Sequence, residues 1–306
     1  MRRFLLAAVL VSGVFLSCGE KNKDRAVAFS SVDVPEEATL AFEPSELEIF
    51  RKAYPDVVFE SSFVSEKEDF LVHVKVEGRE ADFYWSESRF LPGPELPNAK
   101  DFAPLLYAYP VHTPDPEFFS EQDVISIKEY ASEENRKNGV RTPMFLYNLI
   151  YESGKRGPLE THIVKTEFLG KRVNVHERIS QALSRVEKKI LELAETDPEV
   201  KAFVTELDRA EGYAWRSIRD NENSSFHALG TAVDLIPRGV NNKNVYWVWR
   251  RDKDPENWML LPLERRWMPP EKVTLIFESE GFIWGGKWLI WDTIHYEYHP
   301  ELLLYS

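Results

Sequence analysis

The stretch Ser225-Phe226-His227-Ala228-Leu229-Gly230-Thr231-Ala232-Val233-Asp234 has the pattern S-x-H-x-x-G-x-A-x-D. Residues 231–236 are mostly apolar, which predicts a short buried strand that carries Asp234. Gly230 allows a tight backbone turn between His227 and this strand. We therefore expect an imidazole and a carboxylate to converge on one point, one from a loop and the other from a strand.

A second stretch near the end of the chain supplies further polar groups, in the sequence Gly285-Gly286-Lys287-Trp288-Leu289-Ile290-Trp291-Asp292-Thr293-Ile294-His295-Tyr296-Glu297-Tyr298. Aromatic and β-branched residues dominate 293–298, which predicts a strand. Alternate residues of a strand share a face, so His295, Glu297 and His299 are expected on one side. Asp292 lies three residues before His295, in the turn that leads to this strand.

Three of these residues suit a catalytic metal. His227, Asp234 and His295 offer the three protein ligands that a catalytic zinc ion takes while it leaves a fourth position for water. Isolated histidines and aspartates also serve as core residues, strand ends or helix caps. Short motifs match by chance as well, so the residue types alone leave both interpretations open.

Together the two stretches resemble the M15 metallopeptidases, the zinc-dependent D-Ala-D-Ala carboxypeptidases and L-alanyl-D-glutamate peptidases. The form W-G-G-x-W…D-x-x-H-[FY]-E at residues 284–297 is most similar to the L-alanyl-D-glutamate branch and to related phage endolysins. The resemblance covers the C-terminal part of the chain. It implies His227, Asp234 and His295 as zinc ligands and Asp292 as the general base.

The family also has an arginine upstream of the first motif. The run Gly212-Tyr213-Ala214-Trp215-Arg216-Ser217 departs from the family pattern by two inserted residues, so Arg216 is the better match and Arg219 the alternative. Such an arginine would stabilise an oxyanion or a substrate carboxylate by charge-assisted hydrogen bonds. A surface arginine in a turn is the structural alternative. Glu297 and Ser225 are expected just behind the ligands, where Glu297 orients one of them or packs against it.

The implied activity is hydrolysis of peptide bonds in peptidoglycan stem peptides. Zinc would polarise the scissile carbonyl and acidify a water, and Asp292 would take the proton and pass it to the leaving amine. The resemblance leaves two bonds open, L-Ala-D-Glu and the terminal D-Ala-D-Ala. An alternative of another class is a non-catalytic zinc-binding envelope lipoprotein that serves as a wall-binding or scaffold module.

The first residues indicate export. Two arginines precede an apolar run, which predicts a signal peptide at residues 1–17. Cys18 is the one cysteine of the chain and stands where a lipoprotein signal places its lipidated residue. Because a lone cysteine has no disulfide partner, we favour lipidation over simple secretion. Residues 18–42 then form a tether, and the expected location is the periplasmic side of a bacterial envelope.

The charge of the chain limits its partners. The formal net charge is −13, which argues against nucleic acid as a partner. After Cys18, no stretch is apolar enough to predict a membrane span. The expected partners are peptidoglycan stem peptides and, through the lipid on Cys18, the membrane.

The expected fold class is α+β. Residues 43–170 form a small α+β region of unknown role, which could be a spacer, a wall-binding module or a lid. Residues 171–306 form the peptidase-like domain, with a small antiparallel sheet and packed helices. Helices are predicted at 44–54, 120–138, 175–194, 198–210 and 269–281, and further strands at 57–60, 70–76, 81–85 and 161–168. The aromatic segment at 246–261 is either core or a wall of the substrate cleft, and we favour core.

Overall fold

Three antiparallel sheets are present in the part of the chain that the computed structural model describes, residues 42–215 and 225–305. The first sheet has the order β1-β2-β3, with β1 (Val58–Val64), β2 (Asp69–Val76) and β3 (Arg79–Tyr84). The second is the hairpin of β4 (Ile163–Phe168) and β5 (Lys171–His176). The third has the order β6-β7-β9-β8, with β6 (Leu207–Glu211), β7 (Ala232–Pro237), β9 (His295–Tyr298) and β8 (Phe282–Trp284).

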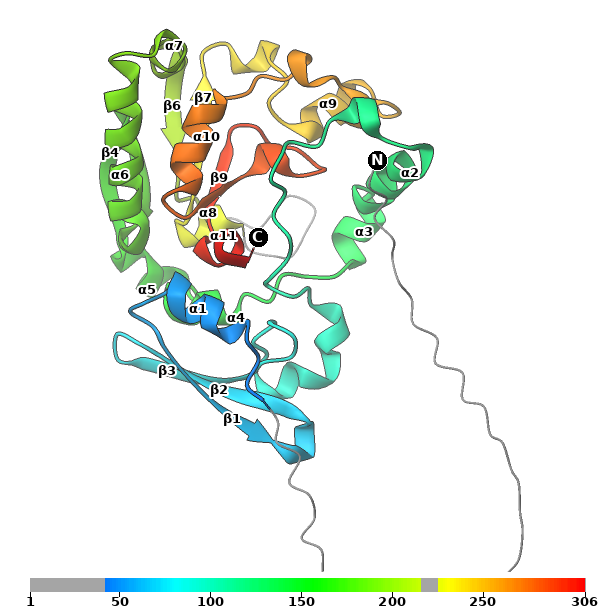
Figure 1. The fold of residues 1–306 in the computed structure, drawn as a ribbon, viewed down its shortest axis with the longest axis vertical. Helices are drawn as coiled ribbons and strands as arrows, with labels where there is room; N and C mark the ends of the chain where they lie inside the picture. Colours follow the sequence, from blue (N-terminus) through cyan, green and yellow to red (C-terminus); the bar gives the residue numbers. More distant parts are fainter. Residues whose placement is uncertain (1–41, 216–224, 306) are drawn as a thin grey trace, which may run out of the picture. The chain divides into compact units, whose positions relative to one another are not determined.

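Helices pack against these sheets (Figure 1). The described α-helices are α1 (Leu47–Ala53), α2 (Glu121–Tyr130), α3 (Glu133–Asn138), α4 (Phe145–Ile150), α5 (Arg156–Thr161), α6 (Glu177–Ala194), α7 (Pro198–Glu206), α8 (Phe226–Leu229), α9 (Trp247–Lys253), α10 (Glu271–Glu278) and α11 (Pro300–Tyr305). This mixture of helices and small antiparallel sheets confirms the predicted α+β class. The predicted signal peptide, the tether as far as residue 41 and Cys18 lie outside the described residues.

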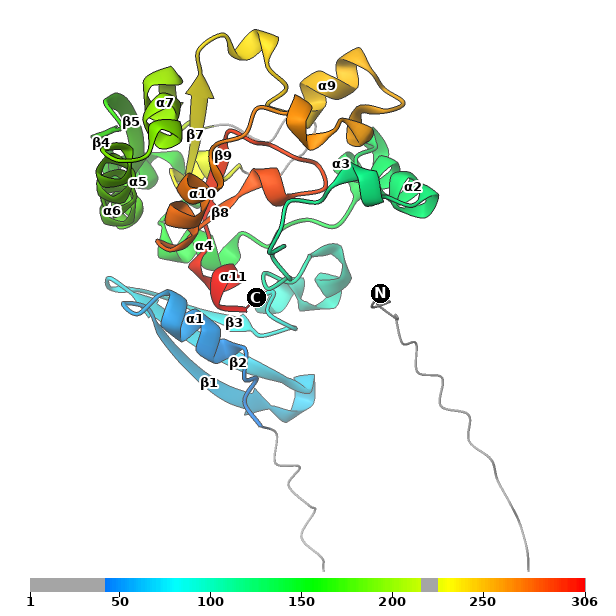
Figure 2. The ribbon, with the colours of Figure 1, turned by 45° about the horizontal axis from the view of Figure 1, so that its top comes forward.

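The first sheet buries one of its faces because apolar and polar residues alternate along β2. The valines of β2 are buried, whereas His73 is partly exposed on the other face. Leu47 and Phe50 of α1 join the valines in the core. α1 also packs against α11, the last helix of the chain, and Figures 1 and 2 both show the two helices side by side. The beginning and the end of the described chain therefore meet at this helix pair.

One apolar core continues from the first sheet to the third. It contains Phe50 of α1, Val186 of α6, Val233 of β7 and Tyr296 of β9, all fully buried. α6 lies along the hairpin β4–β5 (Figure 2) and supplies this core from one stripe of its surface. The hairpin crosses the position at which we divide the chain into regions 43–170 and 171–306, and that division stays a prediction.

The start of α6 differs from the prediction by two residues. Residues 175 and 176 belong to β5, and the helix begins at Glu177. His176 is the N-cap, and its Nδ1 accepts a hydrogen bond of 3.2 Å from the Arg178 backbone N–H. The imidazole thus satisfies one of the free N–H groups that every helix start leaves.

The predicted helix at 198–210 is wrong in its last four residues, 207–210. α7 ends at Glu206, and Leu207–Glu211 form strand β6, which pairs with β7. Leu207 and Ala210 are buried in the strand. The spacing of Leu207 and Ala210 also fits a helix, so the apolar pattern could not distinguish a helix from a strand here. The strand forms because these residues pair with β7.

The predicted helix at 120–138 consists of two helices. α2 opens with the predicted capping box, in which the Ser120 and Asp123 side chains each accept from the other residue's backbone N–H. The helix stops after Tyr130, and Ser132 caps α3 through the Asn135 N–H. A serine followed by acidic residues favours a new helix start over continuation.

The aromatic segment at 246–261 forms a small second core. Trp247, Trp258 and Trp291 are buried there with Met259 and Leu261. The preference for core over a cleft wall therefore agrees with the structure.

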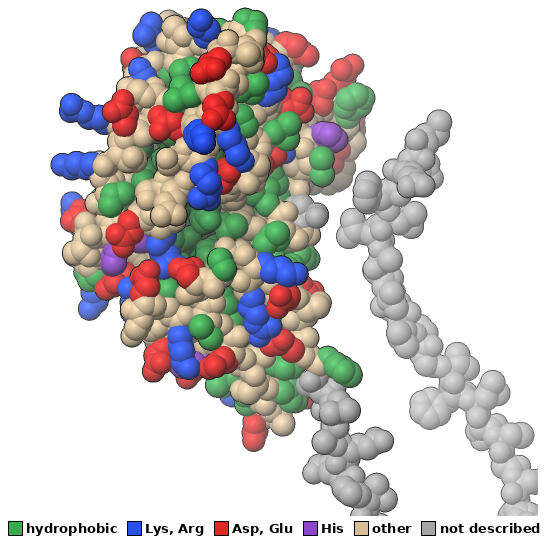
Figure 3. All heavy atoms as spheres, turned by 60° about the vertical axis from the view of Figure 1, so that its left-hand side comes forward, with side chains coloured by type: hydrophobic (Ala, Val, Ile, Leu, Met, Phe, Trp, Pro, Cys, Tyr) green, Lys and Arg blue, Asp and Glu red, His purple; other side chains and the backbone are tan. Residues whose placement is uncertain are grey.

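On the face drawn in Figure 3, acidic and basic side chains are interspersed. Among the described residues, no helix combines the length and the apolar character needed to cross a bilayer.

Candidate metal centre

The third sheet places two of the predicted ligands opposite each other. Asp234 of β7 is paired with His295 of β9 in the antiparallel register. On its other side Asp234 is paired with Glu211 of β6. Because both strands are held by backbone hydrogen bonds, the distance between the two side chains is fixed by the sheet.

His227 comes from α8, a single helical turn. The Ser225 hydroxyl caps this turn by accepting from the His227 backbone N–H at 3.3 Å. Gly230 ends it, and its N–H donates to the His227 carbonyl at 3.0 Å. The predicted role of Ser225 behind a ligand therefore takes the form of a backbone contact that holds the turn.

Gly230 is required at this position for two reasons. Its φ of +73° lies in the left-handed region, which other residues rarely adopt. A Cβ atom here would lie 2.7 Å from Ile163 Cδ1 and 2.8 Å from the His176 nitrogen. The Gly230 carbonyl also accepts a hydrogen bond of 2.8 Å from His176 N–H, so the His227 turn is attached to β5.

The three candidate ligand atoms converge. His227 Nε2 lies 3.2 Å from Asp234 Oδ1 and 3.2 Å from His295 Nδ1, and His295 Nδ1 lies 2.8 Å from Asp234 Oδ1. A tetrahedral zinc ion with bonds of about 2.0–2.1 Å has ligand atoms about 3.3 Å apart. The donor set and its spacing therefore fit a divalent cation, with two imidazole nitrogens and one carboxylate oxygen.

Hydrogen bonds behind the candidate ligands orient both imidazole rings. His227 Nδ1–H donates to the Gly212 carbonyl at 2.7 Å, which leaves Nε2 as the free lone pair. His295 Nε2 contacts Glu297 Oε1 at 2.8 Å, and Nδ1 lies on the opposite side of the ring, 2.8 Å from Asp234 Oδ1. Partners of this kind fix ring orientation and raise ligand basicity in metal sites. The Glu297 carboxylate therefore holds the orientation of the His295 ring.

Gly212 is a site residue that the sequence argument missed. A Cβ atom at Gly212 would lie 2.1 Å from the Asn174 carbonyl oxygen, so only glycine fits against β5. The following N–H, of Tyr213, donates to that same carbonyl at 2.6 Å. The sequence could not indicate this role, because Gly212 acts through its backbone carbonyl, a group that every residue has.

Asp292 lies beside the cluster, where its carboxyl group interacts electrostatically with Asp234 and His295. Its backbone N–H donates to the Gly285 carbonyl at 3.0 Å. The residue is partly exposed, but its Oδ1 atom is buried and has no hydrogen-bond partner among the described residues. Burial raises the pKa of Asp292 to about 7, with the Asp234 charge adding to the rise and His295 opposing it.

The carboxylates next to the histidines stay ionised. Burial alone would raise the pKa of Asp234, but His227 and His295 hold it well below its usual range. Burial likewise opposes ionisation of Glu297, whose hydrogen bonds with His295 and His299 lower its pKa to about 2. Asp234 thus faces the point where the three candidate ligand atoms meet as an ionised carboxylate.

The structure therefore brings together His227, Asp234 and His295, with Asp292 and Glu297 beside them. Arg216 and its alternative Arg219 lie outside the described residues.

Comparison with known families agrees with this site. Residues 219–298 match the M15 peptidase family model described as D-alanyl-D-alanine carboxypeptidase, which supports a peptidase of this family. Residues 46–107 match a separate family described as a domain of unknown function. Neither a curated protein nor a solved structure matches the chain.

Proposed function

We propose that the chain is a zinc-dependent peptidase that hydrolyses peptide bonds in peptidoglycan stem peptides. The match of residues 219–298 to a peptidase family supports the reaction class. The observation that carries the proposal is the geometry of His227 Nε2, Asp234 Oδ1 and His295 Nδ1. These atoms converge in orientations that hydrogen bonds behind them maintain. One oxygen of the neighbouring Asp292 carboxylate has no hydrogen-bond partner in the part of the chain that the structure describes.

His227, Asp234 and His295 would hold the zinc ion. When bound, zinc polarises the scissile carbonyl and lowers the pKa of a water molecule. Gly212 and Glu297 keep the two imidazole rings in the orientation that binding needs.

Asp292 would act as the general base. Its carboxylate accepts a proton from the attacking water and donates it to the amine that leaves. Without a cation, burial favours the protonated carboxyl, as the raised pKa of Asp292 shows. A dication at the neighbouring ligands would favour the ionised form that a base requires. Arg216, or else Arg219, would stabilise the oxyanion.

Two peptide bonds of the stem peptide are candidate cleavage sites, L-Ala-D-Glu and the terminal D-Ala-D-Ala. The W-G-G-x-W…D-x-x-H form favours the L-Ala-D-Glu bond, whereas the description of the matching family names D-Ala-D-Ala carboxypeptidase activity. A carboxypeptidase must recognise a free terminal carboxylate, and an endopeptidase must accept chain on both sides of the bond. The products distinguish the two.

The proposal includes the location of the enzyme. Lipidation of Cys18 after removal of residues 1–17 would hold it on the periplasmic side of the envelope, with residues 18–42 as a tether. This location would bring the site to its peptidoglycan substrate.

A second candidate is a non-catalytic lipoprotein that uses the zinc fold for binding. The separate match of residues 46–107 to a domain of unknown function favours it, since much of the chain lies outside the peptidase match. Asp292 argues against it, because one of its oxygens has no partner within residues 42–215 and 225–305, and a structural zinc site has no use for such a carboxylate beside the metal.

Mass spectrometry of peptidoglycan fragments tests the proposal. The full-length protein in detergent is incubated with purified fragments and zinc, with a chelator, and with zinc restored after the chelator. Release of D-Ala identifies a carboxypeptidase, and new fragments that begin with D-Glu identify an endopeptidase. Absence of product from zinc-loaded protein would overturn the proposal and favour the non-catalytic candidate.

A further inference from the structure

We propose that the N-terminal region 46–107 forms part of the metal centre, because a buried polar chain runs from Tyr54 through Glu301, His299 and Glu297 to the ligand His295. This inference rests on the proposed metal site. It gives the region a positioning role for His295 in place of the three predicted roles of spacer, wall-binding module or lid.

Glu301 is the centre of this polar chain. Its side chain is fully buried at the start of α11. It accepts hydrogen bonds from the Tyr54 hydroxyl at 2.8 Å, the Tyr147 hydroxyl at 2.7 Å and His299 Nδ1–H at 2.7 Å. A buried carboxylate is costly unless its oxygens are satisfied, and here donors from the C-cap of α1, from α4 and from the residue after β9 satisfy them.

His299 connects Glu301 to the ligand side. Its Nδ1 contacts Glu301 Oε1 at 2.7 Å and its Nε2 contacts Glu297 Oε2 at 3.3 Å. An imidazole that donates from both nitrogens is positively charged, which suits a position between two carboxylates. Burial lowers the pKa of His299, but Glu301 and Glu297 raise it overall, to about 9.

Glu297 uses one oxygen for each histidine. Oε1 accepts from His295 and Oε2 from His299, so the carboxylate cannot rotate without losing a contact. The orientation of the His295 ring therefore depends on His299, and that of His299 depends on Glu301. Tyr54 is the point at which region 46–107 enters this chain of contacts.

Aromatic side chains separate the polar chain from water. The Phe226 ring packs edge-on against His299, with ring centres 4.4 Å apart, and also against Tyr147 at 5.5 Å. Phe226 directly precedes the ligand His227 on α8. The buried chain thus packs against the turn that carries the second imidazole ligand, and low polarity around it strengthens each of its hydrogen bonds.

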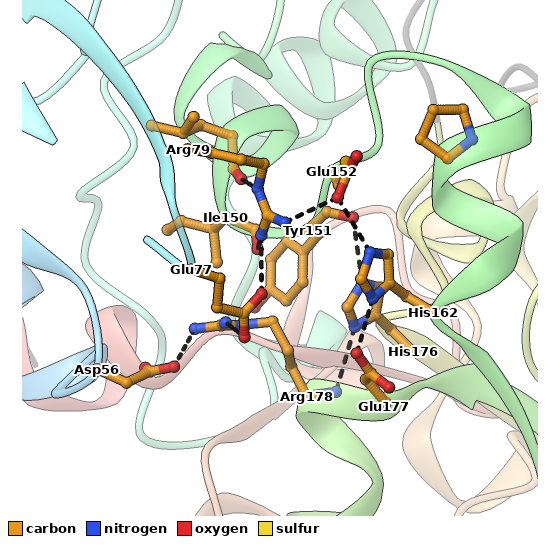
Figure 4. Close-up of polar contacts among 12 residues, drawn as sticks. Asp56, Glu77, Arg79, Ile150, Tyr151, Glu152, His162, His176, Glu177 and Arg178 are labelled. Carbon is orange, nitrogen blue, oxygen red and sulfur yellow. Dashed lines mark hydrogen bonds and ion pairs between the residues drawn. The ribbon is translucent and has the colours of Figure 1, made fainter. Parts of the chain in front are cut away.

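A second set of contacts holds region 46–107 in place (Figure 4). Arg178, at the start of α6, forms ion pairs with Asp56 and with Glu77, the latter at 2.7 Å. Arg79 of β3 pairs with Glu152 at 2.7 Å. These contacts, together with the packing of α1 on α11, fix the position from which Tyr54 reaches Glu301.

The expected role is therefore orientation of His295, and loss of it should weaken metal binding. Tyr54→Phe removes one hydroxyl and keeps the ring that fills the core. Changes to groups that orient metal ligands raise the zinc dissociation constant roughly 10- to 100-fold. We expect about tenfold for Tyr54→Phe and a larger change for Glu301→Gln, which breaks the contacts of His299 as well.

Tyr151→Phe is the matched control. Tyr151 is a buried tyrosine of the same core, and its hydroxyl has no hydrogen-bond partner among the described residues. This variant removes a hydroxyl from the same surroundings and breaks none of the contacts that join Tyr54, Glu301, His299 and Glu297. Its zinc dissociation constant should equal that of the unaltered protein.

The test measures zinc affinity of the full-length protein by competition with a chromophoric chelator, together with the visible spectrum after cobalt loading. Weaker zinc binding and an altered cobalt spectrum in Tyr54→Phe, with neither change in Tyr151→Phe, support the inference. Unchanged affinity and spectrum in a folded Tyr54→Phe protein would overturn it while the proposed function stands. If the unaltered protein binds no zinc, the proposed function fails first and this inference with it.

Discussion

Asp234 and His295 are directly opposite each other on the adjacent strands β7 and β9, and Asp234 Oδ1 lies 2.8 Å from His295 Nδ1. Ligands on paired strands are positioned more rigidly than ligands on loops, because the sheet fixes their separation. His227 completes the cluster from a helical turn that Gly230 attaches to β5. The backbone geometry of the sheet and of the His227 turn therefore positions all three candidate ligands.

Zinc should stabilise the fold through this cluster. A ligand that binds only the folded state stabilises it by about 2.7 kcal/mol at 100 times its dissociation constant. We expect the thermal midpoint of unfolding to rise with zinc in the unaltered protein and not in Asp234→Ala, as measured by calorimetry.

Asp208→Ala is the control for this prediction, because Asp208 is an exposed carboxylate on β6 of the same sheet. It should respond to zinc like the unaltered protein. An equal zinc response in Asp234→Ala would mean that the ion binds elsewhere.

Gly230→Ala should destabilise the fold and weaken zinc binding. The substitution combines a left-handed backbone with contacts below 3 Å to Ile163 and His176. The left-handed conformation alone costs roughly 1–2 kcal/mol, and the contacts add to it. Urea unfolding and zinc titration measure the two effects.

Gly239→Ala is the control that separates backbone strain from steric contact of the added Cβ atom. Gly239 has a φ of +67°, close to that of Gly230, but a Cβ atom added there would have no neighbouring atom within 4 Å. The variant should lose stability through backbone strain only and keep its zinc affinity. Equal losses of stability and of zinc affinity in both variants would show that the attachment of Gly230 to β5 has no role.

Stability should fall in acid because of His176. Its Nε2–H donates to the Tyr151 carbonyl at 3.1 Å and its Nδ1 accepts from Arg178 N–H, so the folded state requires the neutral ring. Burial lowers the pKa of His176 to about 4. The unfolded chain therefore binds this proton more readily, and the contribution of His176 is full above pH 6.5 and is lost as the pH falls to about 4.

This pKa difference corresponds to roughly 3 kcal/mol at most. Because other groups titrate in the same range, the informative quantity is the difference in unfolding free energy between the unaltered protein and His176→Asn. Asparagine also caps helices and does not titrate, so the difference should shrink from about pH 7 to about pH 4. A difference that is constant across this range would contradict the assignment. His73→Asn, at a partly exposed position on β2, is the control.

The candidate ligands could be predicted from the sequence because the two motifs are local. His227 and Asp234 lie seven positions apart, and alternation along a strand placed His295 and Glu297 on one side. The pairing of Asp234 with His295 could not be predicted, since it depends on the register between strands that are distant in the chain. The α7–β6 boundary was missed for a similar reason, because β6 exists through its pairing with β7.

The residues that orient the candidate ligands were harder to predict from the sequence than the candidate ligands themselves. Gly212 acts through its carbonyl, which has no sequence signature. Glu301 follows the last motif and resembles an ordinary acidic residue in the first turn of a helix. Its partner Tyr54 lies 247 positions earlier, so only the folded chain shows that the two meet.

The most direct test of the central claim is hydrolysis of peptidoglycan fragments by Asp292→Asn, with zinc content measured on the same samples. We expect about one zinc ion per chain in both the variant and the unaltered protein. We also expect a loss of hydrolysis of at least about 100-fold in the variant, because the amide cannot accept the proton of the water. Hydrolysis at the unaltered rate by a fully zinc-loaded Asp292→Asn protein would contradict the proposed role of Asp292.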